Sequence, residues 1–292
     1  MKVGCQSMVD KIDTIILKRP EDAFISQEYL DENWEKWGFF ARPDFQECIT
    51  EYRAFENIIR SLVPNVLMMP KDEAAGLDSI YTHDSVKFTK EGAIILNMGK
   101  ATRRNEPASM RDFLEKNNIP ILGEITGEGR VEGGDVLWLE DDRVAIGRGY
   151  RTNDEGIRQF TELTKGLVKE VITVPMPHGN SEEECLHLMS VISPVSKDTA
   201  VIYSRYMPVF FRQMLKEMKL NLIELIDEEY MPLGGNILAV EPGVVVTLSG
   251  NPDVKKKLKD AGIVVHEYVG DNISHKGNGG ATCMTAPVYR IS

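Results

Sequence analysis

The sequence predicts an α/β fold, a five-bladed pseudo-symmetric propeller of repeated ββαβ units that is closed by the C-terminal strand. Three observations predict it. An order of strand, tight turn, strand, amphipathic helix and strand recurs along the chain; the recurrences are spaced by 40 to 60 residues; and the first unit lacks a strand that the C-terminus supplies. We therefore expect residues 1–292 to form a single domain.

The four complete units are recognised by their second strands, which are short β-rich runs after turn residues. These runs cover residues 92–96, 143–147, 199–203 and 243–247. A helical pattern follows each of them, at residues 108–117, 154–167, 208–218 and 252–261. Each helix leads to a further apolar strand, at residues 119–122, 171–174, 220–225 and 263–268.

The fifth unit is split between the two ends of the chain. Residues 11–17 are expected to form its second strand, 44–62 its helix and 65–69 its third strand, while 284–289 supply the first. A last strand that joins the first unit closes a ring. A doubly wound parallel sheet is the alternative, but it leaves the paired strands joined by short turns unexplained.

Composition argues against several classes of partner. The net charge of −11 disfavours nucleic acid and anionic membrane surfaces, although it permits a local cationic pocket. The four cysteines, Cys5, Cys48, Cys185 and Cys283, are far apart and lack zinc-site spacing, so we expect no metal, no cofactor and no disulfide. Neither a signal peptide nor a membrane span is expected, and a cytoplasmic location fits best.

One residue with useful chemistry stands at the start of each first strand. The residues are Asp84, Glu132, His187, Asn236 and Cys283, with 47 to 55 residues between successive members. If the units are equivalent, all five lie at one end of the ring axis and converge on one pocket. Each alone has an ordinary structural explanation. Their recurrence at equivalent positions favours a functional site, because folding does not need different ionisable side chains there.

Cys283 is the candidate nucleophile of this pocket. It follows the glycine-rich stretch GNGGAT at residues 277–282 and precedes an apolar run. Such a turn can hold a thiol at the mouth of a strand, where a substrate reaches it.

Six short motifs follow one another along nearly the whole chain: LDSIYTHD at 77–84, RR at 103–104, EGGD at 132–135, RTN at 151–153, HL at 187–188 and GGATCMT at 279–285. Together, and in this order, they resemble the guanidino-modifying enzymes, which include dimethylarginine dimethylaminohydrolases, arginine deiminases and amidinotransferases. The first of these groups is the most similar. The resemblance implies the same five-fold propeller.

The resemblance also implies hydrolysis of the guanidino group of arginine or an N-methylated arginine through a covalent S-amidino intermediate. Cys283 would attack the guanidinium carbon, and His187 would act as general acid and then as general base. Glu132 would orient His187 or pair with the substrate. The products would be citrulline plus an amine or ammonia.

A further set of residues would bind the small-molecule guanidino substrate. The set is Asp84, Asp78, Arg151, Arg103, Arg104 and Asn236. Carboxylates such as Asp84 suit the guanidinium nitrogens, whereas the forked guanidinium of Arg151 suits a substrate carboxylate. Which of Arg103 and Arg104 faces the pocket is left open.

Two departures from the family pattern bear on the substrate. Met189 replaces an aspartate that deiminases and amidinotransferases have two residues after the histidine, and this favours a substituted guanidine. His83 precedes Asp84, where the similar hydrolases tend to have glutamate, and its role is left open between a neutral hydrogen-bonding group and a surface residue.

Three alternatives remain. An amidinotransferase or an arginine dihydrolase would use the same site, because acceptor choice depends on pocket shape and access of water. A non-catalytic binding protein of the ribosome-binding translation factor type would share the fold, but the retained thiol and the lack of a basic run argue against it. A homodimer is a further expectation.

Overall fold

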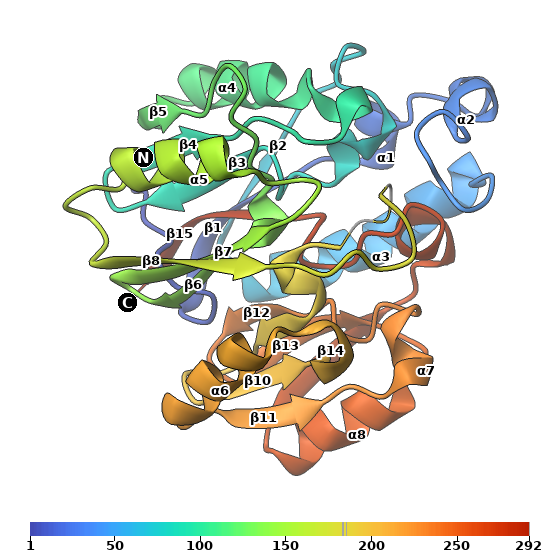
Figure 1. Cartoon of the computed structure of the whole chain (residues 1–292). Coiled ribbons are helices and arrows are strands. Elements are labelled where there is room, and N and C mark those ends of the chain that lie inside the picture. The colour runs from blue at the N-terminus through green and yellow to red at the C-terminus, as the bar shows by residue number, and fades with distance from the viewer. Residues whose placement is uncertain (183, 185, 292) are drawn as a thin grey trace.

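Five three-stranded sheets make up the computed structural model, which describes residues 1–182, 184 and 186–291 (Figure 1). In every sheet the middle strand pairs antiparallel with one neighbour and parallel with the other. An antiparallel hairpin followed by a helical crossover gives this pattern. The predicted series of ββαβ units is therefore confirmed.

The strands of the four complete units follow in chain order. They are β3 (Val86–Thr89), β4 (Gly92–Ile95), β5 (Ile121–Glu124), β6 (Val136–Glu140), β7 (Arg143–Arg148), β8 (Glu170–Pro175), β9 (Ile192–Pro194), β10 (Thr199–Ile202), β11 (Asn221–Glu224), β12 (Leu238–Glu241), β13 (Val244–Leu248) and β14 (Val264–Tyr268). Their crossover helices are α4 (Glu106–Lys116), α5 (Asp154–Leu163), α6 (Val209–Glu217) and α8 (Pro252–Asp260). Figure 1 shows α4 and α8 at opposite edges of the molecule, with sheets between them.

The split unit closes the ring as predicted. Its central strand β1 (Lys11–Leu17) pairs antiparallel with β15 (Ala286–Ile291) and parallel with β2 (Asn65–Met68). The long helix α3 (Phe45–Leu62) crosses between β1 and β2 and begins at Asp44, whose side chain accepts a hydrogen bond from the Glu47 N–H. Apolar residues spaced along one face of α3 are buried, which explains why this stretch is helical.

Three of the first strands begin later than the sequence suggests. Short 3-10 helices precede two of them, η3 (Gly133–Asp135) before β6 and η4 (Leu188–Ser190) before β9. A turn at residues 280–285 precedes the third, β15. The polar residues at the mouth therefore stand on turns above the strands.

The connection between β1 and α3 contains structure that the sequence interpretation missed. Two short helices, α1 (Pro20–Ala23) and α2 (Gln27–Asn33), occupy it, and α7 (Asp227–Tyr230) adds a turn before β12. The remaining short helices are η1 (Leu77–Ile80), η2 (Ala101–Arg103), η5 (Ser204–Tyr206) and the π-helical η6 (Asp271–His275). No helix within the described residues is both long enough and apolar enough to cross a membrane.

Candidate active site

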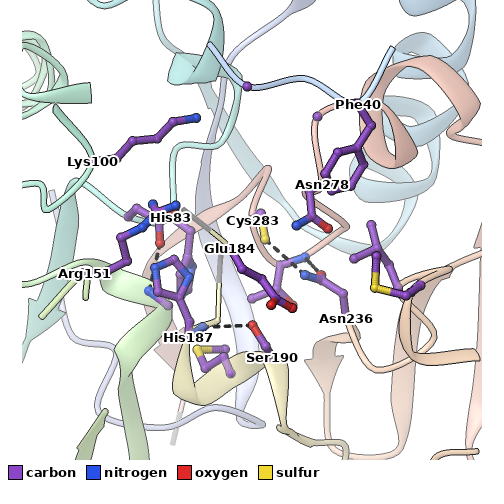
Figure 2. A pocket seen from close by; sticks show the side chains of 18 of the residues that line it. Phe40, His83, Lys100, Arg151, Glu184, His187, Ser190, Asn236, Asn278 and Cys283 are labelled. Carbon is purple, nitrogen blue, oxygen red and sulfur yellow. Dashed lines mark hydrogen bonds between the residues drawn. The ribbon is translucent and has the colours of Figure 1, made fainter. Parts of the chain in front are cut away.

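A cavity of about 720 Å³ opens where the starts of the five first strands meet (Figure 2). Asp84, His187, Asn236 and Cys283, each from a different unit, line it. Glu132 lies directly behind His187 and is fully buried. The structure therefore brings together all five residues that the repeat placed at equivalent positions.

Glu132 binds three partners at the floor of the cavity. Its Oε2 atom lies 2.7 Å from Nε2 of His187 and accepts a hydrogen bond from Nη1 of Arg151 at 3.1 Å. Oε1 accepts from the main-chain N–H of Lys100 at 2.9 Å. Burial alone would raise the pKa of Glu132, but the hydrogen bond to His187 and the charge of Arg151 outweigh it and lower the pKa to about 2. Glu132 is therefore ionised and holds the His187 ring in one orientation.

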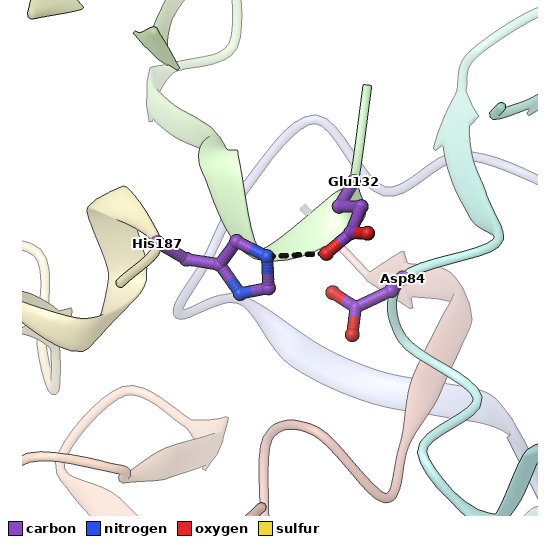
Figure 3. A group of neighbouring side chains, drawn as sticks. All are labelled: Asp84, Glu132 and His187. Carbon is purple, nitrogen blue, oxygen red and sulfur yellow. Dashed lines mark hydrogen bonds and ion pairs between the residues drawn. The ribbon is translucent and has the colours of Figure 1, made fainter. Parts of the chain in front are cut away.

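Asp84 is the second buried carboxylate of the site. Oδ1 accepts from the Gly134 N–H at 2.8 Å, and Oδ2 accepts from Nη1 of Arg103 at 2.6 Å. Burial would raise its pKa, but the Arg103 guanidinium and His187 outweigh burial and hold the pKa of Asp84 well below its usual range. Asp84 thus presents a negative charge beside the His187 ring (Figure 3).

The cluster of Asp84, Glu132 and His187 also has the composition of a metal site, with ligand atoms within 4.8 Å of one another. Its carboxylate oxygens, however, already accept hydrogen bonds from Arg103 and Arg151. A metal ion would have to bind beside two fixed guanidinium groups, which repel it. These residues fit a planar cation with N–H donors better than they fit a metal ion.

The loop that carries His187 allows its ring to approach the neighbouring unit closely. The hydroxyl of Ser190 accepts from the His187 N–H at 3.1 Å and closes the turn of η4. On the other side, a Cβ atom at Gly134 would lie 2.4 Å from Nδ1 of His187. Only glycine leaves room for the imidazole there, which explains Gly134 of the EGGD motif. At Gly133 a Cβ atom would lie 2.1 Å from the main-chain oxygen of His83.

Cys283 projects into the cavity from the glycine-rich turn. Nδ2 of Asn236 donates a hydrogen bond to its Sγ at 3.0 Å, and Oδ1 of Asn236 accepts from the Thr282 N–H at 3.0 Å. The turn packs on Tyr81, whose ring carbon would lie 2.4 Å from a Cβ atom at Gly279. Asn236 therefore fixes both the loop and the thiol, and its donor favours the thiolate form of Cys283.

We expect Asn236→Asp to raise the pKa of the Cys283 thiol and to slow its alkylation at neutral pH at least about tenfold. The new carboxylate still accepts from Thr282 but places a negative charge beside the sulfur. The measurement is the pH dependence of iodoacetamide labelling at the Cys283 peptide. Asn278→Asp, which adds the same charge elsewhere on the cavity wall, is the matched control. Equal labelling of Asn236→Asp and the wild type would show that this contact does not stabilise the thiolate.

Comparison with known proteins now identifies the family. The model of the eukaryotic N,N-dimethylarginine dimethylhydrolases matches residues 31–290. The chain belongs to this dimethylarginine dimethylhydrolase family. The predicted resemblance to guanidino-modifying enzymes is thereby confirmed, as is the prediction of an enzyme, because the family consists of hydrolases that act on C–N bonds.

Two similar relatives illustrate the range of the family's neighbours. The uncharacterized protein YkgA of Bacillus subtilis is 26% identical over 289 residues, which cover 99% of this chain and 96% of YkgA. The arginine deiminase of Limosilactobacillus reuteri is 26% identical over 256 residues, which cover 73% of this chain and 61% of the deiminase. The chain thus spans about three fifths of that deiminase.

Solved structures share the fold at low sequence identity. DDAH from Pseudomonas aeruginosa, in a complex with citrulline, has a TM-score of 0.76 at 23% identity, covering 94% of this chain and 99% of that chain. The N-terminal domain of ArgZ, an arginine dihydrolase from cyanobacteria, has a TM-score of 0.80 at 18% identity, covering 96% and 98%. The amidinotransferase SxtG from Microseira wollei has a TM-score of 0.78 at 14% identity, covering 99% and 98%. These matches confirm the five-unit propeller.

The two neighbouring arginines of this family member do not reach the cavity wall. Arg103 is buried and donates to Asp84, to both oxygens of Glu106 and to the main-chain oxygen of Tyr81. Arg104 is exposed on the surface and is not part of the wall. The structure therefore assigns neither side chain to the place expected for substrate binding. The guanidinium of Arg103 instead donates hydrogen bonds to both Asp84 and Glu106. Its role is therefore to hold Asp84 in place.

Lys100 occupies the position that the arginines were expected to fill. Its Nζ lines the cavity and donates to Oδ2 of Asp78 at 2.6 Å and to the main-chain oxygen of Trp37 at 2.5 Å. Asp78 is thus held behind Lys100, away from the wall. The repeat contained a signal for Lys100, since it follows β4 in the same way that Arg151 follows β7. Arg151 also lines the cavity.

His83 is part of the wall and is buried. Nδ1 donates to the main-chain oxygen of Thr285 at 3.0 Å, which leaves Nε2 to accept from Nζ of Lys87 at 2.8 Å. Burial and the charge of Lys87 lower the pKa of His83 to about 3. His83 is therefore a neutral hydrogen-bonding group and not a surface residue.

The outer wall comes from segments that the sequence interpretation did not assign to substrate. Residues 35–38 and Phe40 lie over the cavity beside Tyr230 and Met231. Trp37 anchors this segment, because its ring fills the space where a Cβ atom at Gly76 would lie, at 1.8 Å. Phe40 is 62% exposed, although it lines the cavity. Met189 also lines the wall, near His187.

Proposed function

We propose that this protein hydrolyses the guanidino group of arginine or an N-methylated arginine by covalent thiol catalysis. The observation that carries the proposal is the thiol of Cys283, held by Asn236 at 3.0 Å in the same cavity as Asp84 and the His187–Glu132 pair. Such an arrangement supplies a nucleophile, a proton carrier and an anion for the substrate cation.

In the first step, the Cys283 thiolate attacks the central guanidinium carbon and a C–S bond forms. The C–N bond to a terminal guanidino nitrogen, the methylated one where a methyl group is present, then breaks, and His187 gives a proton to the amine or ammonia that leaves. The carbon chain of the amino acid stays on the sulfur as an S-alkylthiouronium. Glu132 stabilises the protonated form of His187 during this cycle, since its negative charge lies 2.7 Å away.

In the second step, His187 takes a proton from water, which attacks the same carbon. The C–S bond breaks, the thiolate is regenerated, and the product is the ureido amino acid citrulline. Asp84 binds the guanidinium nitrogens through its negative charge, since this carboxylate stays ionised beside Arg103. Arg151 and Lys100, two cations of the wall, bind the substrate's carboxylate end.

Met189 favours a methylated substrate. Its apolar side chain lines the cavity near His187, and it has no hydrogen bond to offer to an unsubstituted nitrogen. A methyl group packs against it at no cost in lost hydrogen bonds. Cys5 and Cys48 are buried free thiols, which supports a reducing location such as the cytoplasm; Cys185 lies outside the described residues.

The test is product analysis with arginine, monomethylarginine, dimethylarginine, agmatine and guanidinoacetate, with and without glycine as an amine acceptor. We expect citrulline with methylamine or dimethylamine, faster from the methylated arginines than from arginine. Ornithine from arginine would instead show an arginine dihydrolase, and amidino transfer to glycine would show a transferase. Absence of turnover of every substrate would contradict the proposal and favour a binding protein.

A further inference from the structure

A second, much smaller cavity of about 20 Å³ adjoins the first. His83 lines both cavities and separates them. The side chains around the small cavity that carry polar groups include Cys5, Lys87, Trp138 and Arg290. None of these has a role in the proposed chemistry.

Two of these side chains are buried cations. Lys87 is 6% and Arg290 is 5% exposed. Nζ of Lys87 donates to neutral His83, and Nη1 of Arg290 donates to the main-chain oxygen of Asp10. Within the described part of the chain, no carboxylate forms an ion pair with either cation. The acidic groups that act on Lys87 without an ion pair are Cys5, Asp84 and Asp135. Buried cations normally have a counter-charge beside them, because desolvation makes an unpaired ion costly.

Two buried N–H donors at the same cavity also lack an acceptor. Nε of Arg290 and Nε1 of Trp138 are buried and have no hydrogen-bond partner among the residues that the structure describes. A buried donor without an acceptor costs roughly 1–3 kcal/mol of stability. Two such donors and two cations surround one cavity. This excess of positive charge and of N–H donors suits an anion that accepts hydrogen bonds, and it disfavours a cation or a further donor.

We propose that this cavity, bounded by Lys87, Trp138 and Arg290, binds a monatomic anion of the halide class, with chloride as the physiological ion. A cavity needs roughly 10–15 Å³ to hold one water molecule. This cavity of about 20 Å³ therefore admits one ion of about that size and excludes phosphate, sulfate and carboxylates. The anion accepts from the indole and guanidinium N–H groups and neutralises the cations. Burial lowers the pKa of Lys87 to about 8, and an anion beside it favours the charged form.

Cys5 offers a competing source of negative charge. Its thiol lies at the same cavity, and a thiolate there would take the place of the anion. Cys5 also forms a side-chain hydrogen bond with Arg290. The halide is favoured because Nε of Arg290 and Nε1 of Trp138 have no acceptor among the described residues even with Cys5 in this place. A bound halide predicts that chloride raises the melting temperature, whereas a Cys5 thiolate predicts no effect of chloride.

The first test compares the melting temperature of the full-length protein in sodium chloride and in sodium gluconate at equal ionic strength and neutral pH. Gluconate is too large for the cavity. We expect a melting temperature about 2–4 °C higher in chloride, because binding to the folded state stabilises it. The difference should shrink in Trp138→Phe and vanish in Arg290→Met, whereas Trp34→Phe, a tryptophan change away from the cavity, should retain it.

The second test soaks crystals of the protein in sodium bromide and locates bromide by its anomalous scattering. A peak between Lys87, Trp138 and Arg290 would support the proposal. Equal melting temperatures in the two salts, or a chloride effect that survives in both cavity variants, would overturn it, as would a cavity that holds only water. Rapid alkylation of Cys5 without any chloride effect would assign the negative charge to the thiolate instead. Arg290→Met can be omitted if it fails to fold, since Trp138→Phe removes one donor and keeps the ring.

Discussion

Replacing Cys283 by serine is expected to lower the rate of citrulline formation at least about a thousand-fold. A hydroxyl group keeps the place of the thiol and can keep the hydrogen bond from Asn236, which is 3.0 Å from the sulfur. A serine hydroxyl is almost entirely protonated at neutral pH, however, and attacks a cationic guanidinium carbon poorly. The measurement is the steady-state rate of ureido product with a methylated arginine, together with the binding constant of the same substrate.

The matched control for this variant is Cys48→Ala. Cys48 is fully buried against other apolar side chains and lies outside the cavity. Its variant should lose stability, as core truncations do, but should keep its rate per folded molecule. Cys283→Ser should bind the substrate about as tightly as the wild type does. A serine variant that turns over near the wild-type rate would remove Cys283 from the mechanism.

The second large effect is expected for His187→Asn. We predict a loss of about 10²–10⁴-fold in turnover, which is the usual contribution of a general acid and base. Asparagine is too short to reach Glu132 from the turn of η4, because its amide ends near the position of Nδ1 and the bond to Glu132 comes from Nε2. It also neither gives up nor takes up a proton near neutral pH. Release of the covalent intermediate by water should slow, because no base then activates the water. The measurement is burst-phase kinetics, in which the rates of amine release and citrulline release are followed separately.

A histidine elsewhere supplies the control for this prediction. His266 lies on β14, outside the cavity wall, and His266→Asn should keep both rates. If His187→Asn released amine and citrulline as fast as the wild type, the proton carrier would have to be another group. A defect in amine release alone would limit His187 to the acid role.

The five-unit architecture could be predicted because each unit repeats an alternation of patterns along the chain. Strand runs such as 243–247 and the helix after them are both readable from local periodicity. Ring closure followed from a missing strand at one end and a spare strand at the other. The same repeat also placed Asp84, Glu132, His187, Asn236 and Cys283 together, since equivalent positions in a closed ring point at one axis.

The details of the wall could not be predicted in the same way. Arg103 and Lys100 lie three residues apart, and a short helix, η2, turns the first inward to Asp84 and leaves the second at the cavity. No periodic pattern distinguishes the two directions. Whether the segment that carries Trp37 and Phe40 covers the pocket could not be decided from the sequence, because its place depends on contacts with Gly76 and Lys100, which are distant in sequence.

The most direct test of the account is the mass of the Cys283 peptide after acid quench of His187→Asn with dimethylarginine and, separately, with arginine. The account predicts the same adduct from both substrates, equal to the substrate minus its leaving amine, with the amino acid chain still attached to Cys283. An adduct that retains only the amidino group would show a transferase-type cleavage. Absence of any adduct on Cys283, while turnover continues, would contradict covalent thiol catalysis.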